Sequence, residues 1–215
     1  MALNAELAAT KKNFYSSIPS EISQLLENSI STAKSEFDAS KAIQVGATFP
    51  SFNLSDATGK EVTLADLLAK GNGVLISFYR GSWCPYCNLE LRALQKHLAE
   101  FEAKGVTLLA ITPELPDASL TTAEKNELKF PVLSDVGAKL TKEIGIFWQQ
   151  TQGLRGMLSG NGLDWKKQYG DDSFGVPIPA TFLLDKQGVV RNEFLDADWS
   201  TRLEPTTALE WVNKL

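Results

Sequence analysis

The stretch Ser77-Phe78-Tyr79-Arg80-Gly81-Ser82-Trp83-Cys84-Pro85-Tyr86-Cys87 decides the fold, because it places both cysteines of the 215-residue chain between a predicted strand and a predicted helix. The apolar run from Val74 to Tyr79 predicts a strand that is buried on both faces. Pro85 suits the first turn of a helix, where a missing N–H is tolerated. A helix N-terminus stabilises a thiolate, so this Cys-x-x-Cys pair indicates redox chemistry.

The cysteine pair has three alternative interpretations. A structural disulfide with so small a loop would restrict the unfolded chain little. A structural zinc site usually needs four Cys or His ligands, and the chain has two cysteines and one histidine, which excludes a complete Cys/His site. Two buried, inert cysteines remain an alternative. The position of the pair at a strand-to-helix junction favours the redox interpretation.

The apolar pattern of the following helix separates the two thiols. Cys87 falls on the same helical face as Leu91, Leu94, Leu98 and Phe101, and this face predicts burial against the core. Cys84 precedes the apolar face at the tip of the helix. We therefore predict that Cys87 is shielded and that Cys84 is the exposed nucleophile.

Composition narrows the class of protein. Hydrophobic residues make up 43% of the chain and charged residues 22%, as in ordinary globular proteins. A net charge of −5 argues against nucleic acid and anionic membranes as partners. No apolar run approaches the roughly 20 residues of a membrane span, and no signal peptide is visible. The expected location is the cytoplasm, where disulfides are usually transient and catalytic.

The chain divides into a helical extension over residues 1–44 and an α/β domain over residues 45–215. The apolar face from Ile22 to Phe37 predicts an amphipathic helix, which packs on its own domain or on a second subunit in a homodimer. The domain pattern predicts successive elements: a hairpin over 51–64, a short helix over 65–70, the strand 74–79, a helix from Pro85 to Gly105, and a strand over 106–112. Strand, helix and strand of these lengths form a right-handed parallel crossover.

The second half of the domain is less regular. Residues 147–176 contain six glycines and no clear period, which predicts ordered loops that line the site. Residues 182–194 predict a hairpin, and residues 205–215 predict a closing helix with one apolar face.

This order of elements, with Trp83-Cys84-x-x-Cys87 and Pro179-Ala-Thr-Phe182, resembles the thioredoxin fold. Within that fold the chain resembles the alkyl hydroperoxide reductase/thiol-specific antioxidant (AhpC/TSA) family, in particular its peroxiredoxin-like branch. Three stretches of sequence carry the resemblance: the motif from Phe78 to Cys87, Leu120-Thr-Thr-Ala-Glu-Lys-Asn126 and Phe130-Pro-Val-Leu-Ser-Asp135. The expected fold is therefore a mixed β-sheet flanked by helices, with an N-terminal helical extension.

The chain departs from the main peroxiredoxin pattern at several positions. Gly81 stands where those proteins have a threonine, and Ser77 where they have a proline. Pro179 stands where they place an arginine and matches instead the thioredoxin proline, so the Ile178–Pro179 bond is a candidate cis bond. Arg80 is the available cation to replace the missing arginine, with a surface charge as the alternative. Phe78 replaces an acidic residue that many thioredoxins bury.

The resemblance implies two enzymatic functions. In a peroxidase, the Cys84 thiolate attacks hydrogen peroxide or an organic hydroperoxide, Arg80 assists, and Cys87 condenses with the resulting sulfenic acid. A thioredoxin or a glutathione/glutaredoxin system would then regenerate the thiols. The alternative is a thiol–disulfide oxidoreductase without peroxidase activity. Substrate contacts are expected from Trp83, Pro85 and Pro179. The tetrapeptide Cys-Pro-Tyr-Cys is that of glutaredoxins, and Glu90 matches a glutamate of the TlpA/ResA oxidoreductases.

A copper-binding module of thioredoxin fold is the third hypothesis, since two thiolates suit Cu(I). Such proteins also need a histidine at the site. The chain's single histidine, His97, is expected roughly 20 Å from Cys84 along the same helix at 1.5 Å per residue. We therefore predict a peroxidase with no metal and no cofactor.

Overall fold

The apolar run before the cysteines forms β3 (Gly73–Phe78), a central strand that is buried along its whole length in the computed structural model, which describes residues 2–215. Strand β3 pairs in parallel with β4 (Val106–Thr112) and antiparallel with β8 (Ala180–Asp185). Helices α4 (Pro85–Lys96) and α5 (Leu98–Ala103) connect β3 to β4. The predicted parallel crossover is confirmed.

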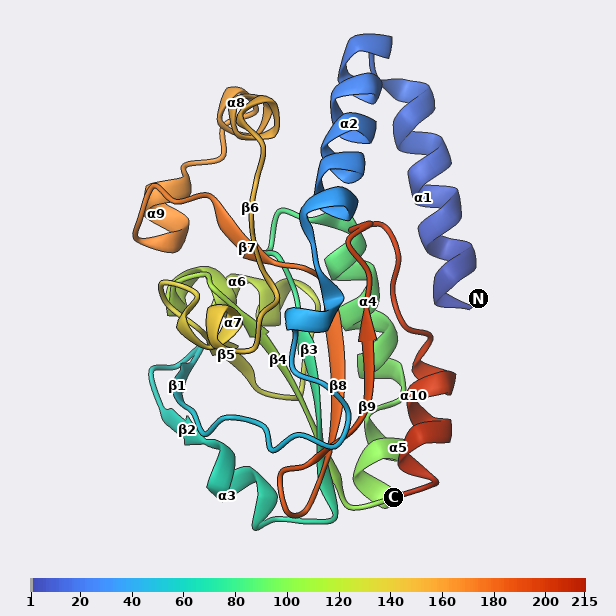
Figure 1. The fold of residues 1–215 in the computed structure, drawn as a ribbon, viewed down its shortest axis with the longest axis vertical. Helices are drawn as coiled ribbons and strands as arrows, with labels where there is room; N and C mark the ends of the chain where they lie inside the picture. The colour runs from blue at the N-terminus through green and yellow to red at the C-terminus, as the bar shows by residue number, and fades with distance from the viewer. Residues whose placement is uncertain (1) are drawn as a thin grey trace.

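The main sheet contains seven strands in the order β2-β1-β5-β4-β3-β8-β9, with parallel and antiparallel pairs. The other strands of this sheet are β1 (Asn53–Asp56), β2 (Glu61–Thr63), β5 (Val132–Ser134) and β9 (Val190–Leu195). The remaining helices of the domain are α3 (Leu64–Leu68), α6 (Pro116–Lys125), α7 (Lys139–Glu143) and α10 (Pro205–Val212). Helices α4, α5 and α10 lie to one side of the strands and α6 and α7 to the other (Figure 1). The chain has the expected thioredoxin-like α/β fold.

The N-terminal segment consists of α1 (Leu3–Ser17), α2 (Ser20–Glu36) and the short 3-10 helix η1 (Ala39–Lys41). Helix α1 contacts α4, and α2 contacts α8, so the extension packs on its own chain. The Glu204 carboxylate accepts hydrogen bonds from the free backbone N–H groups of Leu3 and Asn4 at the start of α1. These contacts fix α1 and α2 at the end of the sheet where β3 terminates (Figure 1).

The segment 147–176, predicted as ordered loops, is more regular than expected. It contains β6 (Phe147–Gln149), α8 (Gln152–Gly160), α9 (Trp165–Tyr169) and β7 (Gly175–Pro177), with β6 and β7 paired antiparallel. The Trp165 ring stacks on Tyr169 with ring centroids 3.8 Å apart and on Phe174 at 4.5 Å. Aromatic stacking among residues of this one segment therefore stabilises its structure.

Two local predictions are wrong. The helix predicted from Pro85 to Gly105 is interrupted at His97, whose N–H bonds to the Leu94 carbonyl three residues back, so that α4 ends and α5 begins. The Ile178–Pro179 bond is trans, as are all peptide bonds within residues 2–215. The Ile178 N–H bonds to the Ile146 carbonyl at 2.7 Å, which continues the β6–β7 pairing, and the extended chain passes directly into β8.

Among the helices of residues 2–215, none combines the length and the apolar character needed to cross a membrane.

Candidate active site

Cys84 is the N-cap residue of α4, and Cys87 lies in the first turn of this helix. Both cysteines are free thiols. Cys87 is fully buried, which confirms the predicted core-facing orientation. Cys84 is only 1% exposed, so the prediction of an exposed nucleophile is wrong. Residues from distant segments, among them Trp199 and Leu154, line the cavity around Cys84, and the local helix pattern carried no signal of them.

Arg80 is 3% exposed, which excludes the alternative that it is a surface charge. Its guanidinium carbon lies 4.7 Å from the centre of the Trp83 ring and 4.6 Å from that of Trp199. Its Nη2 donates to Oε1 of Gln150 at 3.3 Å, and its Nε is buried without a partner among the described residues. Two aromatic rings therefore hold a charged and incompletely hydrogen-bonded guanidinium beside the cysteines.

The two thiols have opposite pKa shifts. Burial acts to raise the pKa of Cys84, but hydrogen bonding with Cys87 and the positive charges of Arg80 and Arg202 lower it to about 6. Burial raises the pKa of Cys87 well above its usual value, and the hydrogen bond and charge of Cys84 raise it further. At neutral pH the pair therefore holds a Cys84 thiolate beside a protonated Cys87, which is the arrangement of a nucleophile and a resolving thiol.

A second buried arginine, Arg202, contacts Cys87 directly. Its Nη2 donates to the Sγ atom of Cys87 at 3.0 Å, and its Nε donates to Oε2 of Glu90 at 2.6 Å. Glu90 also accepts a hydrogen bond from the Ser77 hydroxyl at 3.3 Å. Burial raises the pKa of Glu90 to about 7, although Arg202 acts to lower it. The charges of Arg80 and Arg202 both act on the two cysteines.

A buried carboxyl group, Glu114, holds the loop before Cys84. Its Oε1 accepts hydrogen bonds from the Ser82 N–H at 2.9 Å and the Ser82 hydroxyl at 2.8 Å. The Gln168 side chain in α9 donates to the same oxygen. Burial raises the pKa of Glu114 to about 7. The carboxyl group therefore links β4, the cysteine loop and the 147–176 segment.

Close contacts explain why position 81 is glycine. The Tyr169 hydroxyl accepts a hydrogen bond from Trp83 Nε1 at 2.6 Å and donates to the Arg80 carbonyl at 2.8 Å. A Cβ atom at position 81 would contact the Tyr169 hydroxyl, would lie 2.6 Å from Trp83 Nε1 and would lie 2.9 Å from Glu114 Oε1. The threonine of the main peroxiredoxin pattern does not fit here.

Cys84 lies in the wall of a cavity of about 440 Å³. Arg80, Trp83 and Trp199 also line this cavity, and most of the remaining lining is apolar. Phe14 of α1 and Leu26 of α2 contribute from the N-terminal extension. The 147–176 segment contributes further side chains, namely Leu154, Met157, Leu158, Asn161 and Leu163. We call this cavity the Cys84 chamber; the extension and the segment 147–176 both line it.

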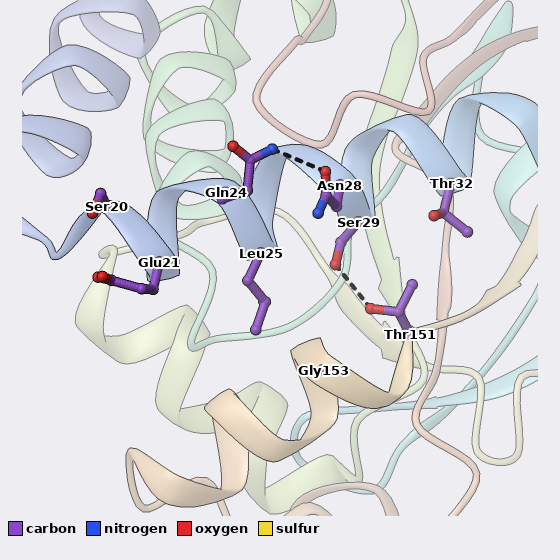
Figure 2. A pocket seen from close by; sticks show the side chains of 9 residues that line it. All are labelled: Ser20, Glu21, Gln24, Leu25, Asn28, Ser29, Thr32, Thr151 and Gly153. Carbon is purple, nitrogen blue, oxygen red and sulfur yellow. Dashed lines mark hydrogen bonds between the residues drawn. The ribbon is translucent and has the colours of Figure 1, made fainter.

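Helices α2 and α8, which both contribute to the lining of the chamber, also contact each other. The Ser29 hydroxyl in α2 hydrogen bonds with the Thr151 hydroxyl at the N-cap of α8 at 2.8 Å (Figure 2). A Cβ atom at Gly153 would lie 3.2 Å from Leu25, so the glycine permits the close approach of the two helices. A polar groove of about 730 Å³ follows this junction and contains no cysteine (Figure 2).

The structure brings together most of the predicted site residues. Arg80, Trp83, Cys84 and Pro85 line the chamber, and Cys87 contacts Arg202. Pro179 is buried immediately before Ala180, which pairs with Phe78 at the end of β3, but Pro179 does not line the chamber. The roles assigned to these residues stay predictions.

His97, at the C-terminal end of α4, forms a hydrogen bond with Glu100 in which Nδ1 lies 2.6 Å from Oε1. Within residues 2–215, no group of three or more His, Cys, Asp or Glu side chains is arranged to hold a metal ion.

Sequence reasoning missed Arg202, Trp199, Gln150, Glu114 and Tyr169. One signal was available for Glu114: it follows the carboxyl end of β4, which lies beside the carboxyl end of β3 in a parallel pair. Arg202 and Trp199 come from an irregular loop after β9, where no periodicity indicates which side chains turn inward.

Fold and site together define a thioredoxin-fold oxidoreductase with a buried, electrostatically activated Cys-x-x-Cys pair. The chain belongs to the AhpC/TSA family, whose model matches residues 45–193.

The chain is 27% identical over 169 residues to the thiol–disulfide oxidoreductase ResA of Bacillus cereus, covering 78% of this chain and 79% of that one. It is 28% identical over 145 residues to a protein named as a peroxiredoxin in Mycobacterium tuberculosis, covering 67% and 80%. The crystal structure of peroxidoxin BcpB from Mycobacterium tuberculosis matches with a TM-score of 0.62 at 20% identity, covering 80% and 98%. This last likeness supports the fold.

Proposed function

We propose that the protein is a thiol-dependent peroxidase that reduces hydrogen peroxide or organic hydroperoxides. The observation that carries the proposal is the placement of Cys84: the thiol is 1% exposed and lies in the wall of a largely apolar chamber of about 440 Å³. A small hydroperoxide fits such a chamber. A folded protein, whether a disulfide substrate or the thioredoxin of the reductive step, would reach Cys84 only if α8 and the N-terminal helices moved apart, whereas a small hydroperoxide does not need this movement.

The chemistry proceeds in three balanced steps. The Cys84 thiolate attacks one oxygen of the hydroperoxide, the O–O bond breaks, and Cys84 becomes a sulfenic acid while the departing alkoxide or hydroxide takes a proton from solvent and leaves as alcohol or water. Cys87 then attacks the sulfur of the sulfenic acid, which forms the Cys84–Cys87 disulfide and releases water. Two thiols of a thioredoxin or of a glutathione/glutaredoxin system finally reduce the disulfide and are themselves oxidised to a disulfide.

Arg80 is the residue proposed to assist the first step. Its charge is among the causes that lower the pKa of Cys84, so that the thiolate is the main form at neutral pH. Arg80 is among the residues that line the chamber, and its Nε is buried without a partner among the described residues, so we propose that this N–H donates to a peroxide oxygen when the substrate enters. A guanidinium held between Trp83 and Trp199 needs little reorganisation during the reaction.

The second candidate function is thiol–disulfide exchange with another protein. The Cys-Pro-Tyr-Cys sequence and the similarity to ResA of Bacillus cereus favour it. In this reaction Cys84 attacks a partner disulfide, and Cys87 releases the reduced partner by attacking the mixed disulfide. Both functions use the same two thiols in the same order.

One assay separates the two functions. The protein is mixed with hydrogen peroxide or cumene hydroperoxide, thioredoxin, thioredoxin reductase and NADPH, or with glutathione, glutaredoxin and glutathione reductase, and loss of NADPH is followed. A peroxidase consumes NADPH only when peroxide and protein are both present. Catalysed reduction of insulin without peroxide-dependent NADPH loss would overturn the peroxidase proposal in favour of thiol–disulfide exchange.

The cysteine variants test the order of the thiols. Cys84→Ser is expected to abolish turnover with every peroxide. Cys87→Ser is expected to consume one equivalent of peroxide, to leave Cys84 as a sulfenic acid that a dimedone probe detects, and to stop cycling with thioredoxin. Normal cycling of Cys87→Ser with thioredoxin would show that Cys87 is not the resolving thiol.

A further inference from the structure

Arg202 has an unusual division of its hydrogen bonds. A buried arginine beside a buried glutamate commonly donates two parallel bonds to the two carboxylate oxygens. Here only Nε bonds to Glu90, at 2.6 Å, while the other Glu90 oxygen accepts from Ser77. The Nη2 group is thereby left free to donate to the Sγ atom of Cys87 at 3.0 Å.

The backbone fixes this orientation. The Nη1 group of Arg202 donates to the carbonyl oxygens of Trp199 and Thr201, both at 2.7 Å. The side chain is 2% exposed, so water does not compete for these bonds. The guanidinium is therefore anchored on three acceptors and directed toward one sulfur.

We propose that Arg202 is a catalytic residue for the second thiol: its guanidinium stabilises the Cys87 thiolate when Cys87 attacks oxidised Cys84 and again when Cys87 leaves during reduction of the disulfide. This inference rests on the cycling of the cysteine pair, which the proposed peroxidase shares with thiol–disulfide exchange. When Cys87 attacks the sulfenic acid of Cys84, the Cys87 sulfur forms a bond to the Cys84 sulfur, and the S–O bond of the sulfenic acid breaks with loss of hydroxide. The proton of the Cys87 thiol and this hydroxide form water.

The electrostatics change when Cys84 reacts. In the reduced protein, burial first and then the hydrogen bond and charge of Cys84 keep the pKa of Cys87 high. Conversion of Cys84 to a sulfenic acid or a mixed disulfide removes the negative charge, but Arg202 remains 3.0 Å from Cys87. Arg202 then stabilises the Cys87 thiolate, and no negative charge on Cys84 opposes this effect. Six ionisable groups interact electrostatically with Cys87. Cys84 and Glu90 belong to the start of α4 and to α4 itself, Tyr79 and Arg80 follow β3, Glu114 follows β4, and Arg202 lies in the loop after β9.

A small neutral disulfide tests the proposal without peroxide. Reaction of the reduced protein with 4,4′-dithiodipyridine releases one thiopyridone as Cys84 forms a mixed disulfide, and a second as Cys87 attacks the Cys84 sulfur and displaces the remaining thiopyridone. The two releases are followed separately by stopped-flow absorbance over a range of pH. The first reports Cys84, and the second reports Cys87.

Arg202→Met removes the charge but keeps much of the side-chain volume. We expect the second release to slow by about 10- to 100-fold, since a hydrogen bond to a charged group is lost. The pH midpoint of the second release is expected to move upward. The midpoint of the first release is expected to move upward as well, because Arg202 also lowers the pKa of Cys84, but its rate at about pH 8 and above, where Cys84 is a thiolate in both proteins, is expected to change by less than about threefold. Arg202→Lys keeps a charge and is expected to recover part of the second rate. Arg191→Met, which removes an arginine paired with Asp185 at 2.6 Å on β9, is the matched control and should change neither rate.

Removal of Arg202 leaves Glu90 in the core without its partner, so Arg202→Met can fail to fold. The comparison is then made between Glu90→Gln and the double variant Arg202→Met/Glu90→Gln, in which no charge is left unpaired. A second release that is equally fast with and without Arg202 would overturn the proposal. Because no peroxide is used, this result is distinguishable from failure of the peroxidase assay.

Discussion

The carboxyl group of Glu114 accepts both hydrogen bonds that Ser82 can donate, one from the backbone N–H at 2.9 Å and one from the hydroxyl at 2.8 Å. Ser82 lies two residues before Cys84, and Glu114 lies just after β4. The conformation of the cysteine loop therefore depends on a buried acid from a different strand. Burial raises the pKa of this acid to about 7, so its protonation changes in the neutral range.

Glu114 is expected to make stability depend on pH. The pKa rises from 4.5 to about 7 on folding, so the native protein binds more protons than the unfolded chain between pH 4.5 and pH 7. The free energy of unfolding therefore falls as pH rises through this window, by about 3 kcal/mol at most. Glu114→Gln removes this contribution. Urea denaturation of the reduced proteins at a series of pH values should show the variant gaining stability relative to wild type from pH 4.5 to pH 8; a constant difference would contradict the prediction.

Arg80→Met is expected to raise the pKa of Cys84, because burial remains while one of the two neighbouring positive charges is lost. The rate of alkylation by iodoacetamide is measured against pH in a Cys87→Ser background. Within this background, the midpoint should lie at least about one unit higher in the Arg80→Met variant than in the protein that keeps Arg80. Arg92→Met serves as the control, since Arg92 lies on the same helix as the cysteines but bonds to Asn126. An unchanged midpoint in Arg80→Met would remove Arg80 from the activation of Cys84.

The central elements could be predicted from the sequence because the side chains that pack in the core follow the spacing of a buried strand or of one helix face. The apolar run before the motif became β3, and the face that carries Cys87 became buried. The local pattern failed where burial comes from distant segments. Cys84 precedes the apolar face of α4, and nothing in the adjacent residues indicates that α8 and the N-terminal helices cover it.

Local sequence patterns also identify only some of the charged residues at the site. Arg80 lies within the motif and could be recognised, whereas Arg202 is 115 residues from Cys87 along the chain and contacts its sulfur. A buried guanidinium of this kind is defined only by the partners that the fold supplies. Trp199, three residues before Arg202, likewise acquires its role by packing on Arg80.

Gly81→Thr, which restores the residue of the main peroxiredoxin pattern, is expected to destabilise the protein. The added side chain would displace the Tyr169 hydroxyl and break its hydrogen bond with Trp83, at a cost of about 1–3 kcal/mol for overpacking. Guanidinium denaturation followed by tryptophan fluorescence measures the loss. Gly156→Ala in α8 is the matched control, because a Cβ atom there has no neighbour within 4 Å, and it should be neutral or slightly stabilising. Equal stabilities of the two variants would show that position 81 tolerates a side chain.

Met157→Trp is expected to narrow the Cys84 chamber and so to discriminate between peroxides. Met157 lines the chamber from α8, whereas Ser159 on the same helix is exposed and lies outside it. The kcat/KM for cumene hydroperoxide should fall by about tenfold or more in Met157→Trp, since the indole ring then occupies space that the cumyl group of the substrate needs. The kcat/KM for hydrogen peroxide should change by less than about threefold, because a molecule of this size needs little of the chamber. Ser159→Trp adds the same ring outside the chamber and should leave both values unchanged. If Met157→Trp lowers both values equally, the chamber wall controls access or folding and does not select the substrate.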